Sequence, residues 1–438
     1  APPENPMERR TFVKSIAASL ASVPFLTEAC RALDDQLQTL SAYVSAATTD
    51  LARWRRVRGE FLLNPGLVHL NTGSLGACPR LVVDAVSAHL HTIEGDPVHT
   101  LWGSLGNGME QVRATAAEFL GAGIDEVAIT RNTTEGMNAV AMGIDLAPGD
   151  EVLTTNHEHG GGMSCWQYLA RRRGIKVVCL KMPAPAASAE QIVQLVTDHL
   201  TPKTRVCSFS HVETITGLQM PLARIAAVTR PRGVLLVCDG AQAPGMLAID
   251  VKALGVDAYA SSSHKWLLAP KGSGLLYVRK EAQDRVRPIM FADGYQAYSG
   301  SFGTRDVAGV LGHGIAIDFH NAIGRERIEA RCRQLNQYLR DRFARIPAMR
   351  LLTPSQPELS SGIATYALDR PKGANGELAG HLLAAYNIAV KTVPGTYAYV
   401  PDPDVPREDY NALRFSTHLY NDEHEIDRTA DAIAARLS

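Results

Sequence analysis

Short apolar runs and amphipathic segments alternate along the chain between about residues 110 and 280. The continuous apolar runs predict buried strands over residues 127–130, 151–155, 176–180, 205–211, 233–238, 257–261 and 274–279. Apolar residues at helical spacing predict helices over residues 110–120, 134–146, 164–173, 189–200 and 221–229. Apolar strands separated by helices are typical of an α/β fold, with a mainly parallel sheet sandwiched by helices. Ligands of such sheets lie beyond the carboxyl ends of the strands.

The pattern changes after about residue 312, where helical spacing becomes more frequent, beginning with a helix predicted over residues 325–346. We therefore predict a large domain over residues 85–312 and a smaller α+β C-terminal domain over residues 313–438. Residues 31–84 are expected to form an N-terminal segment that packs on the small domain.

Residues 1–30 have the layout of an export signal. A basic stretch that includes Arg9, Arg10 and Lys14 precedes an uncharged apolar run over residues 15–26. Paired arginines followed by Phe12 are typical of a twin-arginine signal, which predicts a periplasmic protein. The run is too short to span a bilayer, which needs roughly 20 residues, so no membrane span is expected in the mature protein. An amphipathic first helix is the alternative.

Composition excludes several kinds of partner. The chain has 44 basic and 45 acidic residues, a balance that gives no sign of nucleic acid or acidic lipid as a partner. Its seven cysteines are odd in number and lack metal-ligand spacing, so neither a disulfide framework nor a zinc site is expected.

A lysine and an aspartate each stand at the end of a predicted strand. Lys265 closes the run Ser261-Ser262-Ser263-His264-Lys265, and a desolvated lysine beside His264 can act as a nucleophile. Asp239 ends another strand and is followed by Gly240-Ala241-Gln242. A carboxylate there can hold a protonated pyridine nitrogen, while Gln242 reaches a ring hydroxyl; a helix N-cap is the alternative role of Asp239. These are the requirements of pyridoxal 5′-phosphate (PLP) chemistry.

Two further turns can serve the same cofactor. The segment Asn132-Thr133-Thr134-Glu135-Gly136 opens a predicted helix, whose free N–H groups and positive end favour a phosphate dianion. A capping box is the alternative role of this segment. His159, followed by three glycines, can stack on a pyridine ring. A metal site formed by His157 and His159 is the less favoured alternative, and no metal is expected.

The ordered set Glu158-His159, Asp239-Gly240-Ala241-Gln242 and Ser262-Ser263-His264-Lys265 resembles the class V aminotransferases of fold type I, over about residues 65–425. Within that family the chain is similar to the isopenicillin N epimerase-like branch. This closer resemblance is carried by residues 70–76, 132–135, 302–306, 414–416 and 420–421.

The resemblance implies a role for each matching residue. Lys265 would form the Schiff base and shuttle a proton at the substrate's α-carbon. Asp239 would bind the pyridine nitrogen, Gln242 the phenolic oxygen, and His159 would stack on the ring. The phosphate would be held by Thr133, Thr134, Ser262 and His264, with Gly303 and Thr304 reaching across from the other subunit of a homodimer. Arg414 would pair with the substrate α-carboxylate, with help from Asn71.

The segment around Thr214 departs from the family pattern. Many members have asparagine near the ring oxygen, where this chain has Thr214 with Glu213 beside it. Glu213 is therefore either a further acid near the substrate or, as we favour, an exposed loop charge.

The resemblance leaves several reactions open. An exported member is similar to the periplasmic tailoring enzymes of pyoverdine siderophores, which modify a glutamate unit by oxidative decarboxylation or transamination. An amino-acid epimerase or a C–S lyase is the alternative. A cysteine desulfurase is disfavoured, because the only cysteine after Phe319 is Cys332, which lies in a helical pattern. A binding protein on this fold would lack the lysine or the acid, and a nicotinamide dehydrogenase would need a Gly-x-Gly-x-x-Gly turn, which is not found where it should stand.

Overall fold

The computed structural model describes residues 24–287, 304–393 and 408–438. Its larger sheet has seven strands in the order β2-β8-β7-β6-β5-β3-β4. These strands are β2 (Val127–Thr130), β3 (Glu151–Thr155), β4 (Lys176–Leu180), β5 (Thr204–Ser210), β6 (Leu235–Asp239), β7 (Ala258–Ser262) and β8 (Gly274–Val278). Neighbouring strands from β4 to β7 run parallel, and β8 is antiparallel to both β2 and β7. The sheet is therefore mixed and mainly parallel.

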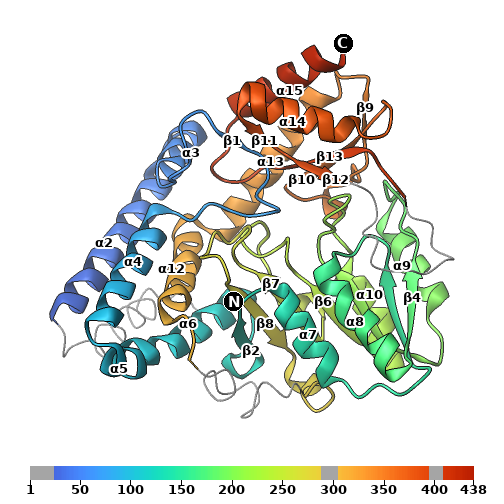
Figure 1. The fold of residues 1–438 in the computed structure, drawn as a ribbon, viewed down its shortest axis with the longest axis horizontal. Coiled ribbons are helices and arrows are strands. Elements are labelled where there is room, and N and C mark those ends of the chain that lie inside the picture. Colours follow the sequence, from blue (N-terminus) through green and yellow to red (C-terminus); the bar gives the residue numbers. More distant parts are fainter. Residues whose placement is uncertain (1–23, 288–303, 394–407) are drawn as a thin grey trace.

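Alternate residues of these strands enter two separate cores. One face packs against α7 (Thr133–Gly143) and α8 (Gly160–Arg173). The opposite face packs against α6 (Leu105–Leu120), α9 (Ala189–His199), α10 (Leu222–Thr229) and α12 (Val307–Ile323). The short α11 (Val251–Leu254) follows β6. Because helices cover both faces, the strands are apolar throughout, as the sequence predicts (Figure 1).

A second, four-stranded antiparallel sheet forms in the C-terminal part of the chain, in the order β12-β13-β10-β9. Its strands are β9 (Met349–Leu351), β10 (Ile363–Leu368), β12 (Lys391–Val393) and β13 (Ala412–Ser416). The accompanying helices are α13 (Arg325–Phe343), α14 (Ala374–Tyr386) and α15 (Glu423–Leu437). This unit forms its own apolar core.

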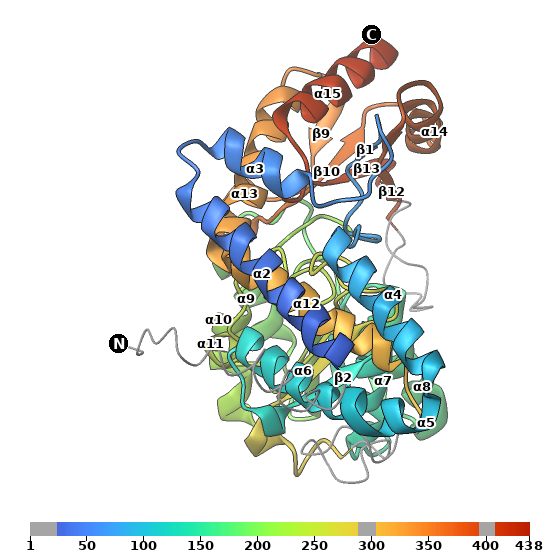
Figure 2. The same ribbon diagram turned by 90° about the vertical axis from the view of Figure 1, so that its left-hand side faces the viewer.

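The N-terminal segment contacts both of these parts. Its elements are α2 (Pro24–Ala46), α3 (Asp50–Arg58), β1 (Val68–His69), α4 (Arg80–Gly95), α5 (Pro97–His99) and a single π-helical turn over Thr100–Ser104. Helices α2 and α4 pack on α12, and α2 lies across α12 in Figure 2. Arg58 forms an ion pair of 2.6 Å with Glu425 of α15. Strand β1 pairs in parallel with β11 (Ile388–Ala389).

The predicted strands between residues 127 and 279 are all present, with ends that move by one or two residues. Four helices differ more. Helices α6 and α8 begin earlier than predicted, at Leu105 and Gly160, and α7 and α13 end earlier, at Gly143 and Phe343. The predicted domain boundary at residue 312 falls inside α12. Residues 1–23 of the expected export signal lie outside the described residues, and the rest of it falls in α2.

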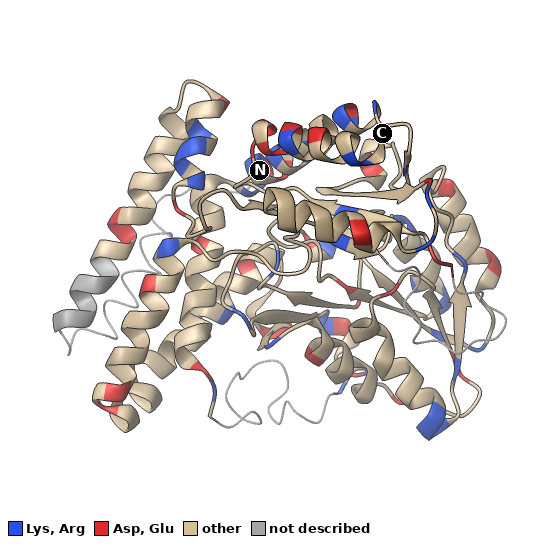
Figure 3. Cartoon of the chain, turned by 45° about the horizontal axis from the view of Figure 1, so that its top comes forward, with Lys and Arg blue, Asp and Glu red and all other residues tan. Residues whose placement is uncertain are grey.

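Charged residues of both signs are interspersed along the helices, most visibly on α13 and α15 (Figure 3). Over the described ranges, none of the helices combines the length and apolar character needed to cross a membrane.

Candidate active site

A cavity of about 360 Å³ lies at the carboxyl ends of the central parallel strands, between the large sheet and the C-terminal unit. It is lined by Gly73, Ser74, Asn132, Thr133, Thr134, His159, Gly161, Thr214, Asp239, Ala241, Gln242, Ser262, His264, Lys265, Lys391 and Arg414. Turns after β2, β3, β5, β6 and β7 supply most of these residues. This is where a parallel sheet places its ligands.

Lys265 follows β7 in a tightly held loop. The Gly76 N–H donates to the His264 carbonyl oxygen at 3.0 Å, and a Cβ at Gly76 would lie only 2.0 Å from the Lys265 carbonyl oxygen. The next carbonyl, of Trp266, accepts from His418 Nε2 at 2.7 Å and from His320 Nε2 at 3.2 Å. The lysine is thus fixed through its backbone.

Burial of the Lys265 ammonium lowers its pKa to about 8; the Asp239 carboxylate opposes this shift and the Arg414 guanidinium adds to it. About a tenth of Lys265 is therefore uncharged at pH 7, far more than for a lysine with the ordinary pKa of about 10.4. An uncharged amine is the form that attacks a carbonyl carbon or accepts a proton.

Asp239 ends β6 and is almost completely buried, with Oδ1 accepting from the Ala241 N–H at 2.9 Å. A second carboxyl, Glu158, accepts hydrogen bonds from the hydroxyls of Ser210 at 2.6 Å and Thr155 at 2.9 Å. Burial raises the pKa of Glu158 to about 8, and the charge of Asp239 acts in the same direction. Glu158 therefore retains its proton near neutral pH.

The N-terminus of α7 forms one end of the cavity. Ser262 Oγ accepts from the Thr133 N–H at 3.0 Å and lies 2.9 Å from Thr133 Oγ1. Asn132 caps the helix by accepting from the Glu135 N–H at 2.9 Å. Burial lowers the pKa of His264 to about 4, so that its ring is neutral. Its Nδ1 is buried without a partner among the described residues. Helix N–H groups, hydroxyls and a neutral imidazole suit a phosphate group.

His159 begins α8 and accepts from the Gly161 N–H through Nδ1 at 3.0 Å. Burial, followed by the charge of Lys265, lowers the pKa of His159, so a neutral imidazole faces the cavity. His157 does not line the cavity. Its ring lies 2.8 Å from Glu213 Oε2 through Nδ1 and 2.8 Å from Tyr410 Oη through Nε2. The described part of the chain contains no cluster of three or more side chains suited to a metal ion.

Glu213 is not an exposed loop charge, and that prediction was wrong. Its side chain is only 1% exposed and accepts from the Thr216 hydroxyl at 2.5 Å as well as contacting His157. Both contacts are made by Oε2. Glu213 does not line the cavity either, although its neighbour in sequence, Thr214, does.

Arg414 lies on β13 with its guanidinium directed into the cavity. It donates to Thr214 Oγ1 at 2.5 Å, to the Thr214 carbonyl at 3.2 Å and to Ser74 Oγ at 3.2 Å. Asn71 Oδ1 accepts from it at 3.4 Å but does not itself line the cavity. The structure therefore places Thr214 and Asn71 as residues that hold Arg414.

Gln242 links the segment around Gly73 to the segment that follows Lys265. Its amide nitrogen donates to the Gly73 carbonyl at 2.9 Å, and its oxygen accepts from Trp266 Nε1 at 2.7 Å. The amide nitrogen carries a second hydrogen, which is the one able to reach a ring hydroxyl.

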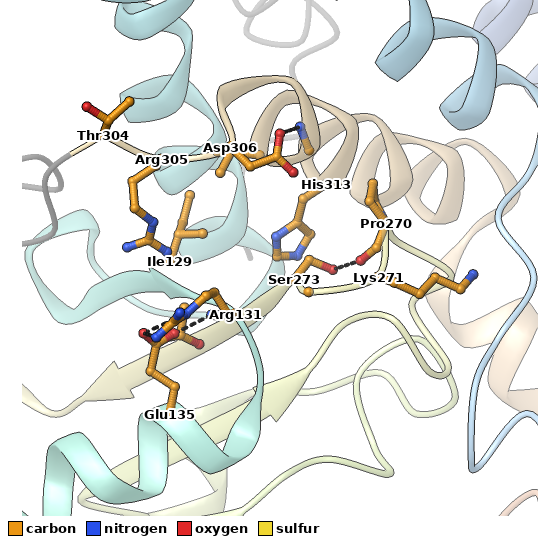
Figure 4. Close-up of a pocket in the computed structure, with 14 residues that line it drawn as sticks. Ile129, Arg131, Glu135, Pro270, Lys271, Ser273, Thr304, Arg305, Asp306 and His313 are labelled. Atoms are coloured by element: carbon orange, nitrogen blue, oxygen red, sulfur yellow. Dashed lines mark hydrogen bonds and ion pairs between the residues drawn. The ribbon is translucent and has the colours of Figure 1, made fainter. Parts of the chain in front are cut away.

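Thr304 does not join this cavity within one chain. It lines a separate hollow of about 390 Å³ near the start of α12, with Arg131, Ser273, Arg305 and His313 (Figure 4). Gly303 lies outside the described residues. Their predicted role, in the phosphate site of a second subunit, stays a prediction.

The sequence reasoning missed Lys391, which belongs to a three-residue strand without any periodic signal. It also gave Gly73 and Ser74 no role, although both stand in a motif that it singled out. Cys332, the cysteine that bears on the choice of reaction, is buried in α13, and its burial raises the pKa of the thiol to about 12. It does not line the cavity.

Comparisons with known proteins agree with this arrangement. The family model described as "Aminotransferase class-V" matches residues 74–429. Isopenicillin N epimerase of Streptomyces clavuligerus is 33% identical over 88% of this chain and 98% of its own. A cysteine desulfurase of Salmonella newport is 30% identical over 83% of this chain and 91% of its own. The solved structure of a C-DES mutant, with glycine covalently linked to the PLP cofactor, has a TM-score of 0.73 and 25% identity, covering 87% of this chain and 98% of that one.

Proposed function

The chain belongs to the class V aminotransferase family of PLP-dependent enzymes, and we propose that it moves a proton at the α-carbon of an amino-acid substrate. One observation carries this proposal: Lys265, Asp239, His159 and Arg414 line a single cavity although they come from four distant segments. When bound, PLP withdraws electrons from the α-carbon and so makes its proton acidic.

The residues of the cavity fit PLP from end to end. The N-terminus of α7, with Ser262 and His264, would hold the phosphate. The Asp239 carboxylate would hold the protonated ring nitrogen, and the neutral His159 ring would lie on a face of the pyridine. Buried polar atoms at this end, such as His264 Nδ1, find no partner among the described residues, as expected where a ligand supplies one.

Arg414 and Lys265 are the residues that would handle the substrate. A guanidinium already held by Thr214 and Ser74 is preorganised to pair with the α-carboxylate. This pairing fixes the α-carbon, and the lowered pKa of Lys265 lets its Nζ accept the α-proton and return it.

Proton return without a catalytic thiol favours epimerisation among the available reactions. An epimerase removes the α-proton and returns a proton to the opposite face of the α-carbon, which requires no nucleophilic cysteine. Cys332 is too deeply buried to act as such a nucleophile. The similarity to isopenicillin N epimerase supports this reading. C–S bond cleavage is the alternative reaction, given the similarity to cysteine desulfurase.

We further propose a periplasmic location, with the glutamate unit of a pyoverdine-type siderophore as substrate, changed by oxidative decarboxylation or transamination. The paired Arg9 and Arg10, and the resemblance to periplasmic tailoring enzymes, support this proposal. Cell fractionation is its test. Recovery of the protein only in the cytoplasm would remove the support for a siderophore substrate and leave the small amino-acid substrates.

The first test of the proposed function is the absorbance spectrum of the purified protein with PLP. We expect a band near ~420 nm that borohydride removes, and a covalent adduct that peptide mass mapping places on Lys265. Lys265→Ala should lack both, and its turnover should fall by about 10³-fold or more, because it loses the nucleophile and the base together. A protein that stays colourless with added PLP would overturn the proposal.

A further inference from the structure

Lys391 brings to the cavity a positive charge that the proposed chemistry does not use. It begins β12, and its register partner on the neighbouring antiparallel strand is Arg414. Both side chains line the cavity. Directly opposite residues of an antiparallel pair lie on the same face of the sheet, with Cβ atoms about 4.5–5.5 Å apart. Lys391 and Arg414 therefore form a pair of cations directed at one space.

Such a pair is unfavourable unless an anion joins it. Like charges directly opposite one another destabilise a sheet. Lys391 makes no ion pair with any carboxylate in the described ranges, and Asp239 is the only acidic residue among those that line the cavity. The charge of Lys391 also reaches the ring pocket, where it contributes, after burial, Lys265 and Arg414, to the lowered pKa of His159.

The expected anions are each accounted for without Lys391. The N-terminus of α7 would hold the phosphate, and Arg414 would pair with the α-carboxylate. Lys391 is only partly buried, so its flexible chain can follow a ligand. Lys391 is a cation next to the α-carboxylate site, and neither the phosphate nor the α-carboxylate needs it. It is therefore suited to bind a second acidic group on the same substrate.

We propose that Lys391 determines specificity by binding a second carboxylate that the substrate carries beyond its α-carbon. The substrate class is then a dicarboxylic amino-acid unit rather than an amino acid with a neutral side chain. This inference rests on the proposed function, since it takes Arg414 as the site of the α-carboxylate.

The test compares ligands that differ in one charge, using the PLP-loaded protein and the change in the cofactor's absorbance on binding. L-glutamate and the longer L-2-aminoadipate are the dicarboxylic ligands, and L-glutamine is the neutral one. We expect the protein to bind at least one dicarboxylic ligand more tightly than glutamine. Lys391→Met should weaken that ligand about tenfold or more, with glutamine unchanged, since a charge-assisted contact is lost only for the dicarboxylate. Lys391→Arg, which keeps the charge, should retain most of the preference.

Two controls separate the ways in which the inference can fail. Lys372→Met removes a lysine of the same unit that is exposed and paired with Asp409, and it should change neither ligand's affinity. Equal weakening of glutamate and glutamine by Lys391→Met would show that Lys391 serves the α-carboxylate, and a wild-type protein without any preference would also overturn the inference. Failure of the proposed function itself would be seen earlier, as the absence of the borohydride-sensitive band.

Discussion

The two sides of the cavity are built in different ways. On one side, Lys265 and Asp239 stand at the ends of buried parallel strands. The backbone around the lysine is held by close contact with Gly76 and by the hydrogen bond that His418 donates to the Trp266 carbonyl. On the other side, Arg414 and Lys391 stand on the small antiparallel sheet, where the hydrogen bonds that Arg414 donates to Thr214 and Ser74 are its main restraints.

The difference separates what is fixed from what can vary. A larger side chain introduced near Lys265 would contact backbone atoms, which cannot move without disturbing the strands of the large sheet. Substituting a residue near Arg414 meets the ends of side chains, which can adopt new rotamers. We therefore expect the lysine side to preserve the cofactor chemistry and the arginine side to set the substrate, as the different reactions of the epimerase and desulfurase relatives require.

Acid should lower the stability of the part of the fold around Lys265 first, and this loss of stability is the largest effect that we expect. Burial lowers the pKa of His418 to about 3 and that of His320 to about 4, while an unfolded histidine titrates near 6.5. The unfolded state therefore binds protons first, and stability that is fully present above about pH 6.5 is lost as the pH falls toward the folded values. The loss is about 2 kcal/mol for each histidine by about pH 5.

Urea unfolding at a series of pH values, together with the cofactor absorbance band, checks this dependence. His418→Gln is the matched variant, because it keeps a donor for the Trp266 carbonyl and removes one titrating group, so it should flatten the acid limb. A stability that is constant between about pH 7 and pH 5 would contradict the neutral, buried state of these rings.

Two glycines of one short segment offer a direct comparison of the sides. A methyl group on Gly76 would lie 2.0 Å from the Lys265 carbonyl oxygen, whereas one on Gly73 would lie 2.9 Å from a side-chain nitrogen of Arg414. Gly76→Ala should cost about 1–3 kcal/mol of stability and weaken PLP binding. Gly73→Ala should cost less and act mainly on substrate affinity. Unfolding curves and PLP titrations measure both, and a greater loss of stability in Gly73→Ala would reverse the assignment of the rigid side.

Arg414→Lys should give the smallest of these changes and the most local one. The charge remains, but the two-pronged contact with a carboxylate is lost, so the dissociation constant for an amino-acid ligand should rise about tenfold. The borohydride-sensitive band should be unchanged, since no cofactor contact is assigned to Arg414. A variant that loses the band would place Arg414 in the cofactor site instead.

The large sheet was predictable because its physics is local. Each buried strand is a continuous apolar run, and the polar residues that follow these runs, such as Asp239 and Lys265, mark the edge where ligands lie. The cofactor side of the cavity could therefore be drawn from the order of motifs along the chain, and the fold type was confirmed.

The substrate side could not be drawn in this way, because it depends on pairings between distant segments. Lys391 becomes a site residue only through its register with Arg414, which no local pattern encodes. Glu213 looked like a loop charge because its partner His157 is remote in sequence, and a buried carboxyl group needs such a partner.

The pairing of β1 with β11 also sets the order in which parts of this protein can fold during synthesis. About 320 of the 438 residues separate the two strands, so the segment from β1 to Gly76 lacks this partner strand until β11 has left the ribosome. Contacts between such distant segments form late and slowly. The contact of Gly76 with the Lys265 backbone and the hydrogen bonds that hold Arg414 are therefore completed together, at the end of synthesis. A nascent or C-terminally truncated chain should bind no cofactor.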